Sequence, residues 1–224
     1  MTPTLPPDEA TLKAYYVSGA WRAQTLYDIV AAHRAERPDA PAVTNSFRTF
    51  SWREFVDQVD AFAADLAHRG LERGDTIFVG APNRIETVIA LLAASRDGFV
   101  CCPSPHRNHT IAEIADMCAR ASCAAYIHQP GHGADATERD ILPLIRELAS
   151  IRHIYELTPD TGGAPFGAQI EAASGKAAAP AGNPDLVSYL AFTSGSTGTP
   201  KGVMHSDNTQ LVAARGIAAA WGSA

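Results

Sequence analysis

The first half of the chain alternates between segments with helical spacing of apolar residues and short, continuous apolar runs. Residues 26–37 have helical spacing, and "PAVTNSFRTF" after them offers two β-rich runs with a turn between, which predicts a hairpin. Ser51 and Glu54 then form a capping box that predicts a helix ending at Gly70. Its apolar residues recur every three or four positions: Phe55, Val59, Phe62 and Leu66. We therefore expect a helix with one buried face.

Three strand-length apolar runs follow, "DTIFVGA", "GFVCCP" and "CAAYIH". Helical segments separate them, one at residues 84–96 and one opened by a second capping box, Thr110 with Glu113. Alternation of buried strands with helices predicts a parallel-rich sheet covered by helices on both faces, so the expected fold class is α/β. Charges on the first covering helix, including Arg84 and Glu86, are interpreted as its solvated face.

The second half of the chain has weaker periodicity. A helix is predicted at residues 141–149 and a strand at "IRHIYEL". Residues 158–184 are rich in Ala, Gly and Pro, which indicates a long surface connection. Order resumes in "DLVSYLAFT", a predicted strand that is followed by a glycine-rich turn, a short strand and a helix with Ser206 or Asp207 as its N-cap.

Composition and charge exclude several classes of protein. The 224 residues are 46% hydrophobic and 19% charged, as in an ordinary globular protein. The net charge of −6 gives no excess of positive charge that would attract nucleic acid or an anionic membrane. The longest strongly apolar run, residues 88–94, is too short to span a bilayer, and the N-terminus lacks a signal-peptide pattern. We expect a cytoplasmic protein without a membrane span or a nucleic-acid partner.

Four cysteines lie in one short region: Cys101, Cys102, Cys118 and Cys123. Together with His106 and His109 they offer enough ligands for a zinc site. Adjacent residues of a strand point to opposite faces, however, so Cys101 and Cys102 are poorly placed to reach one ion. The reading that we favour is reduced thiols in the core and histidines in a loop, with no metal ligand assigned.

The segment "FTSGSTGTPKGV" has the chemistry of a polyphosphate-binding turn. Glycines allow close approach of the backbone to a ligand, hydroxyls and backbone N–H groups can donate to oxyanions, and Lys201 adds a positive charge. It is not a Walker loop, because Pro200 precedes the lysine and Gly202 follows it. A plain linker would need neither the Pro-Lys-Gly ending nor the apolar strands on both sides.

At these residues the sequence closely resembles the phosphate-binding signature of the adenylate-forming (AMP-binding) enzymes, and it is most similar to acyl-CoA synthetases. The upstream "T-(Y/W)-x-E-L" helix, the "G-(V/L)-x-x-G-D-x-V" strand entry and the "P-N" turn of that superfamily are also matched, so the resemblance covers residues 26–208. It implies the N-terminal part of the family's large domain. Residues 1–24 are then an N-terminal extension and residues 25–224 a partial AMP-binding domain.

The resemblance also implies site residues and cofactors. Lys201 would act as a catalytic residue that contacts the phosphates of ATP while a carboxylate attacks the α-phosphorus, giving an acyl-adenylate and pyrophosphate. Mg²⁺ would bridge phosphate oxygens, with its main ligand beyond residue 224, and CoA is the expected co-substrate. The residues that would bind the β- and γ-phosphates are Thr193, Ser194, Gly195, Ser196, Thr197, Gly198, Thr199 and Lys201.

The sequence departs from the family pattern in two respects. A histidine usually opens the helix after the signature, whereas here Asp207 holds that position and His205 is displaced. The family's remaining elements also lie beyond residue 224, so we expect a fragment of a longer enzyme.

Three interpretations of function therefore stay open. The first is the N-terminal part of a carboxylate–CoA ligase that acts on an alicyclic, aromatic or fatty acid. The second is a truncated, inactive nucleotide-binding protein that self-associates or pairs with a chain supplying the rest. The third is an aryl-acid or amino-acid adenylating enzyme that loads a carrier protein.

Overall fold

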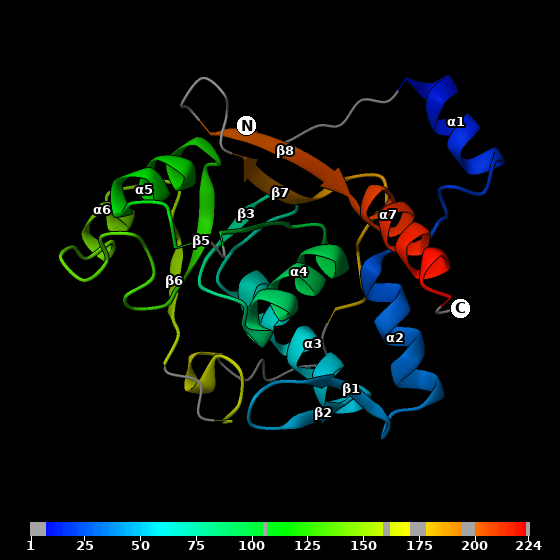
Figure 1. Cartoon of the computed structure of the whole chain (residues 1–224), viewed down its shortest axis with the longest axis horizontal. Helices are drawn as coiled ribbons and strands as arrows, with labels where there is room; N and C mark the ends of the chain where they lie inside the picture. The colour runs from blue at the N-terminus through cyan, green and yellow to red at the C-terminus, as the bar shows by residue number, and fades with distance from the viewer. Residues whose placement is uncertain (1–7, 105–106, 159–161, 171–177, 194–199, 223–224) are drawn as a thin grey trace.

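In the computed structural model, a six-stranded sheet forms the centre of the chain and helices cover it (Figure 1). The structure describes residues 8–104, 107–158, 162–170, 178–193 and 200–222. The strand order is β6-β5-β3-β4-β7-β8, and all neighbours are parallel except β7 and β8. The bounds are β3 Thr76–Gly80, β4 Val100–Pro103, β5 Cys123–His128, β6 His153–Glu156, β7 Val187–Thr193 and β8 Lys201–Ser206. The predicted α/β class with a parallel-rich sheet is confirmed.

The helices and the small hairpin follow the sequence patterns closely. Both predicted capping boxes are present, and a third, Thr25 with Asp28, opens α2. The hairpin consists of β1 Pro41–Thr44 and β2 Thr49–Ser51. The helices are α1 Glu9–Val17, α2 Leu26–Glu36, α3 Trp52–His68, α4 Ile85–Asp97, α5 Ile111–Arg120, α6 Leu142–Arg146 and α7 Asp207–Ala220. The sequence analysis missed α1, and α6 is shorter than the predicted helix at residues 141–149.

Two apolar cores lie on opposite faces of the sheet. One contains side chains of α3 and α4, such as Phe62 and Ile89, and the other contains side chains of α5 and α6, such as Ile114 and Ile145. Cys101 belongs to the first core and Cys102 to the second, as alternation along a strand requires, so these two thiols face away from each other. Burial raises the pKa of the Cys101 thiol to about 12, which keeps it protonated.

Part of the segment that the composition marked as a surface connection, residues 158–184, belongs to the core. Phe166 is 3% exposed, and its ring stacks on Phe62 with the centroids 4.2 Å apart. Further along, the backbone N–H groups of Ala181 and Gly182 donate to the carbonyl oxygen of Arg96 at the end of α4. Low periodicity could not show this, because one aromatic side chain and a few backbone hydrogen bonds hold the segment.

Candidate functional site

The predicted phosphate-binding turn connects the last two strands of the sheet. Thr193, the last residue of β7, pairs with Lys201, the first residue of β8, and its hydroxyl donates to the Lys201 carbonyl oxygen at 3.4 Å. Residues 194–199 lie outside the described part of the chain, so the binding roles of Ser194, Gly195, Ser196, Thr197, Gly198 and Thr199 stay predictions. The structure thus brings the two ends of the turn together.

Strand pairing places these two ends beyond β4 in the sheet. β7 runs parallel to β4, with Tyr189 opposite Cys101, and β8 returns antiparallel to β7. The chain goes from β3 to β4 on one side and then crosses to β5 on the other side of β3, which creates a switch point between β3 and β5. In open α/β sheets, ligands bind outside the carboxyl ends of the strands at such a point. The turn after β7 is separated from this switch point by β4.

Arg120 of α5, which the sequence analysis missed, holds the far end of the turn. Its guanidinium donates to the carbonyl oxygen of Pro200 at 2.8 Å and lies 5.4 Å from the centre of the Phe192 ring. Lys201 is exposed beside it. Two cationic residues therefore lie at the entry to β8, although Asp116, 3.6 Å from the Arg120 guanidinium, offsets part of its charge. From the helical periodicity alone, Arg120 is only a polar residue, and its contact with Pro200 cannot be inferred.

Asp207, the residue at the family's histidine position, is a buried junction between four elements. It is 1% exposed, and its Oδ2 accepts from the backbone N–H of Leu26 at 2.9 Å and from the Ser95 hydroxyl at 2.5 Å. The Ser188 hydroxyl donates to Oδ1. The carboxylate is thus used to join α2, α4 and β7 to the start of α7, and it is not directed at a substrate.

The neighbouring Asn208 ties the N-terminal segment to the same place. Its side-chain oxygen accepts from the backbone N–H of Arg22 at 2.9 Å, and its amide donates to Asp185 at 2.8 Å and to the Tyr16 hydroxyl at 3.1 Å. Tyr16 in turn donates to Asp185. Residues 1–24 were expected to be an extension, and in the described part of this segment Tyr16 and Arg22 are bonded to the start of α7 and to the residues before β7.

His205 remains on β8 itself. Its ring lies 6.0 Å from the Tyr189 ring of β7, and its Nδ1 is 3.4 Å from the Thr209 hydroxyl. These neighbours belong to the hairpin and to α7, and the described contacts give His205 no partner of catalytic type. The family pattern has a histidine at the start of this helix. Here Asp207 occupies that position, and His205 lies two residues earlier, on β8.

We expect Asp207→Asn to lower the free energy of unfolding by about 1–3 kcal/mol, because one acceptor oxygen of a buried, fully paired group is replaced by an amide donor. Urea denaturation monitored by circular dichroism measures the change. Asp39→Asn is the matched control, since the Asp39 side chain is 86% exposed and should give almost no change. Equal effects in the two variants would contradict the role of Asp207 as a junction.

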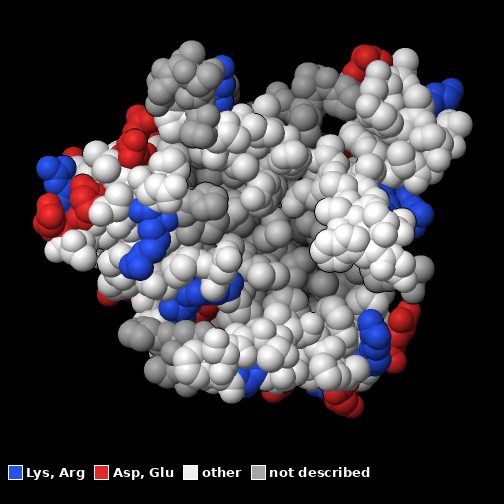
Figure 2. Space-filling view, in the orientation of Figure 1, with Lys and Arg blue, Asp and Glu red and all other residues white. Residues whose placement is uncertain are grey.

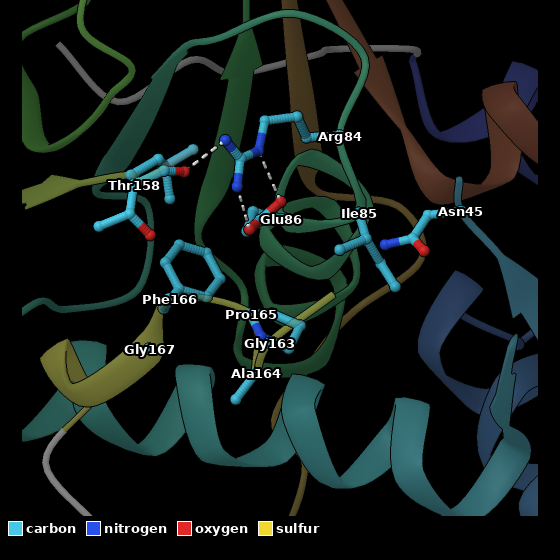
Figure 3. Close-up of a pocket in the computed structure, with 11 residues that line it drawn as sticks. Asn45, Arg84, Ile85, Glu86, Thr158, Gly163, Ala164, Pro165, Phe166 and Gly167 are labelled. Atoms are coloured by element: carbon cyan, nitrogen blue, oxygen red, sulfur yellow. Dashed lines mark hydrogen bonds and ion pairs between the residues drawn. The ribbon is translucent and has the colours of Figure 1, made fainter. Parts of the chain in front are cut away.

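A second buried polar group lies at the carboxyl end of β3 (Figure 3). Arg84 makes a two-fold ion pair with Glu86, at 3.0 Å from Nε and 2.8 Å from Nη2. Its Nη1 donates to Gln129 at 3.0 Å and to the Thr158 carbonyl oxygen at 2.8 Å. The prediction of a solvated face was wrong for these charges: the side chains are 9% and 6% exposed, because they turn inward to bridge the loops after β3, β5 and β6.

The cavity beside this pair is small and leaves little room for a ligand. Its volume is about 40 Å³, close to the space of one water molecule. Figure 3 shows Arg84 above Glu86, Thr158 on the left, Phe166 and Pro165 below, and Ile85 and Asn45 on the right. We therefore interpret the Arg84–Glu86 pair as a brace that fixes the loops at the carboxyl edge.

The surface charge agrees with a local anion site. On the face in Figure 2, basic and acidic side chains of the described residues are interspersed and form no continuous basic patch. The net charge of −6 likewise gives no general attraction for a polyphosphate, so Lys201, Arg120 and the backbone of the turn are the local groups that we consider for it. None of the described helices has the length and apolar character that a membrane crossing requires.

Comparisons with known proteins agree with this geometry. The chain is 33% identical to enterobactin synthase component F of Escherichia coli (strain K12) over 183 residues, which are 80% of this chain and 12% of that protein. It is 32% identical to a CoA ligase of Mycobacterium tuberculosis over 187 residues, 81% of this chain and 36% of the ligase. The apo structure of Mycobacterium smegmatis MbtA is similar with a TM-score of 0.76 and 25% identity, over 93% of this chain and 38% of MbtA.

The matched region includes all six strands of the central sheet. The family model for the AMP-binding enzyme matches residues 30–223, from within α2 through the turn to the end of α7. The chain spans well under two thirds of each of the relatives above. From this match together with the hairpin geometry, we conclude that the chain belongs to the AMP-binding family of adenylate-forming enzymes.

Proposed function

We propose that this chain supplies the phosphate-binding part of an enzyme that activates a carboxylic acid with ATP. The observation that carries the proposal is the pairing of Thr193 with Lys201 across the two ends of the "SGSTGTP" turn, between the antiparallel strands β7 and β8. A carboxylate oxygen of the substrate would attack the α-phosphorus, the bond to the β-phosphate oxygen would break, and pyrophosphate would leave. The products are an acyl-adenylate and pyrophosphate.

In this reaction the protein acts by positioning and by charge stabilisation. The hydroxyls and backbone N–H groups of residues 193–199 donate to the β- and γ-phosphates, and the ammonium of Lys201 neutralises negative charge that moves onto the leaving group. Mg²⁺, when bound, adds further neutralisation of the phosphates. Within the described residues, no group of three or more acidic, histidine or cysteine side chains is arranged to hold a metal ion. We therefore assign the Mg²⁺ ligands to no residue of this chain.

For the acid and its acceptor we favour an aryl or amino acid that passes to the thiol of a carrier protein. Similarity to enterobactin synthase component F and to MbtA supports this class. The expectation of a CoA ligase remains as a second candidate, supported by the similarity to the Mycobacterium tuberculosis enzyme. The inactive, partner-dependent protein is the alternative to both.

The test is exchange of labelled pyrophosphate into ATP, using the longest protein in which this chain occurs naturally and panels of aryl, amino and fatty acids. Acid-dependent exchange is the expected result, with the aryl or amino panel giving the highest rates. Loading of a carrier-protein thiol is then compared with formation of a CoA thioester. Loss of exchange in every panel would support the inactive alternative.

The contact of Arg120 gives a prediction of its own. Arg120→Ala should raise KM for ATP about two- to fivefold while leaving kcat nearly unchanged, because it releases an exposed contact that positions the far end of the turn. Pyrophosphate exchange at varied ATP concentration measures both constants. Arg146→Ala, on the exposed side of α6, is the control. A change of kcat alone would contradict the positioning role.

A further inference from the structure

The β7–β8 hairpin, which carries the predicted phosphate-binding turn, extends outward from the sheet. The strand register pairs β7 with β4 at one position, Tyr189 with Cys101, and β8 lies at the edge of the sheet beside β7. Among the described residues, the register pairs Leu190 to Thr193 with β8 and with no other strand. The turn therefore lies at the end of an arm, and its position depends on what holds the base of that arm.

Buried hydrogen bonds at the base of the hairpin join its two ends. Asp185 precedes β7 and Asn208 lies in the first turn of α7, directly after β8, and the Asn208 amide donates to the Asp185 carboxylate at 2.8 Å. The Asn208 backbone N–H donates to the Pro184 carbonyl oxygen at 3.0 Å. Asn208 is 0% exposed, so the loss of these partners would leave a buried polar group unpaired. The base of the hairpin thus depends on the partners of Asn208.

Tyr16 of α1 bonds to both ends of the hairpin at once. Its hydroxyl donates to the Asp185 carboxylate, with 2.8 Å to Oδ1 and 2.9 Å to Oδ2, and accepts from the Asn208 amide at 3.1 Å. The backbone N–H of Arg22 donates to the Asn208 side-chain oxygen at 2.9 Å. The Tyr16 ring meets the Trp21 ring edge to face, with the centroids 6.3 Å apart, and Trp21 is 7% exposed. This packing limits the freedom of the Tyr16 side chain.

The remainder of α1 packs little against the protein. None of the residues Glu9–Val17 is buried, and α1 lies at the periphery of the molecule (Figure 1). Its apolar burial therefore contributes little to the free energy of folding. Among the hydrogen bonds of the described residues, those that join α1 to residues beyond the N-terminal segment all belong to Tyr16. The contact of α1 that matters to the rest of the protein is thus the one at the base of the hairpin.

We propose that Tyr16 is a positioning residue for the phosphate-binding turn: its hydroxyl holds Asp185 and Asn208 together and so fixes the angle at which the β7–β8 hairpin leaves the sheet. The six residues of β8 span about 20 Å, so a tilt of about 3° at the base moves the far end of the strand by about 1 Å. A displacement of this size slows a reaction that depends on alignment. The inference rests on the proposed adenylation, because the turn must bind ATP for its position to affect the reaction.

Hydrogen–deuterium exchange of the 224-residue chain, measured by mass spectrometry, tests whether Tyr16 holds the hairpin. We expect Tyr16→Phe to make the backbone amides of β7 and β8 exchange about three- to tenfold faster, because the base loses hydrogen bonds while the ring volume is kept. Peptides from β3 and β5 should exchange as in the parent.

Tyr15→Phe is the matched control for this experiment. It removes a hydroxyl one residue earlier, for which the described contacts give no hydrogen-bond partner, and it keeps the ring that stacks on Trp21 with the centroids 5.0 Å apart. Exchange in β7 and β8 should then equal that of the parent. Equal exchange rates in the two variants would overturn the proposal.

Kinetics of the longest natural protein that contains this chain separate positioning from a merely structural role. In pyrophosphate exchange, Tyr16→Phe should raise KM for ATP about two- to fivefold and leave KM for the acid unchanged, whereas a loss of folded protein would lower kcat alone. Faster hydrogen exchange with an unchanged KM for ATP would overturn the positioning role. A parent protein without pyrophosphate exchange would instead overturn the proposed adenylation, and the hydrogen-exchange rates would still decide whether Tyr16 holds the hairpin.

Discussion

Replacing Lys201 with Ala is expected to lower kcat/KM for adenylation about ten- to hundredfold, because it removes a charge-assisted hydrogen bond to the phosphates in the transition state. Lys201 is exposed at the first residue of β8 and has no role in the core, so the free energy of unfolding should not change. Pyrophosphate exchange in the full-length protein gives the first quantity, and urea denaturation gives the second.

Two further variants make this result specific. Lys13→Ala removes an exposed lysine from α1, far along the sequence from the turn, and should leave exchange unchanged. Gly198→Val should slow exchange as Lys201→Ala does, because a branched side chain would hinder the approach of phosphate to the turn. Normal exchange in both the Lys201 and the Gly198 variants would remove the phosphate-binding assignment.

Breaking the Arg84–Glu86 pair should have the largest effect on stability. We expect Arg84→Met to lower the free energy of unfolding by about 3–5 kcal/mol, because the Glu86 carboxylate would stay buried without its counter-charge. The loops after β5 and β6 would also lose the donors to Gln129 and Thr158. Urea denaturation measures the loss, and the double variant Arg84→Met with Glu86→Leu should recover most of it.

An exposed ion pair provides the matched control. Arg53 lies 3.2 Å from Asp39, with side chains that are 54% and 86% exposed. Arg53→Met should therefore change the free energy of unfolding by less than about 1 kcal/mol. If Arg84→Met cost no more than Arg53→Met, the Arg84–Glu86 pair would not brace the loops.

Much of the fold could be predicted from local patterns. The capping boxes at Ser51 and Thr110 act over a few residues, and each opens a helix in the structure. The buried runs at residues 76–80 and 123–128 are fully buried strands, because continuous apolar runs between helices occur where a parallel sheet is covered on both faces. The predicted phosphate-binding turn could also be located, since its glycines and lysine lie within a few residues of one another in the chain.

The positions that were misjudged depend on contacts between distant residues. Arg84 and Glu86 read as surface charges, because a sequence cannot show that Gln129 and Thr158 approach them. Asp207 gave no signal of a junction for the same reason, since its partners are Leu26, Ser95 and Ser188.

The amino-acid sequence by itself determined the helices that open with a predicted capping box and the buried strands, because capping and periodicity act over a few neighbouring residues. The chemistry of the turn stays a prediction. Only the tertiary structure decided which strands are neighbours, and with them the switch point between β3 and β5. It also decided which polar side chains are buried, such as Arg84, Asp207 and His132, because burial depends on elements that meet only when the chain has folded.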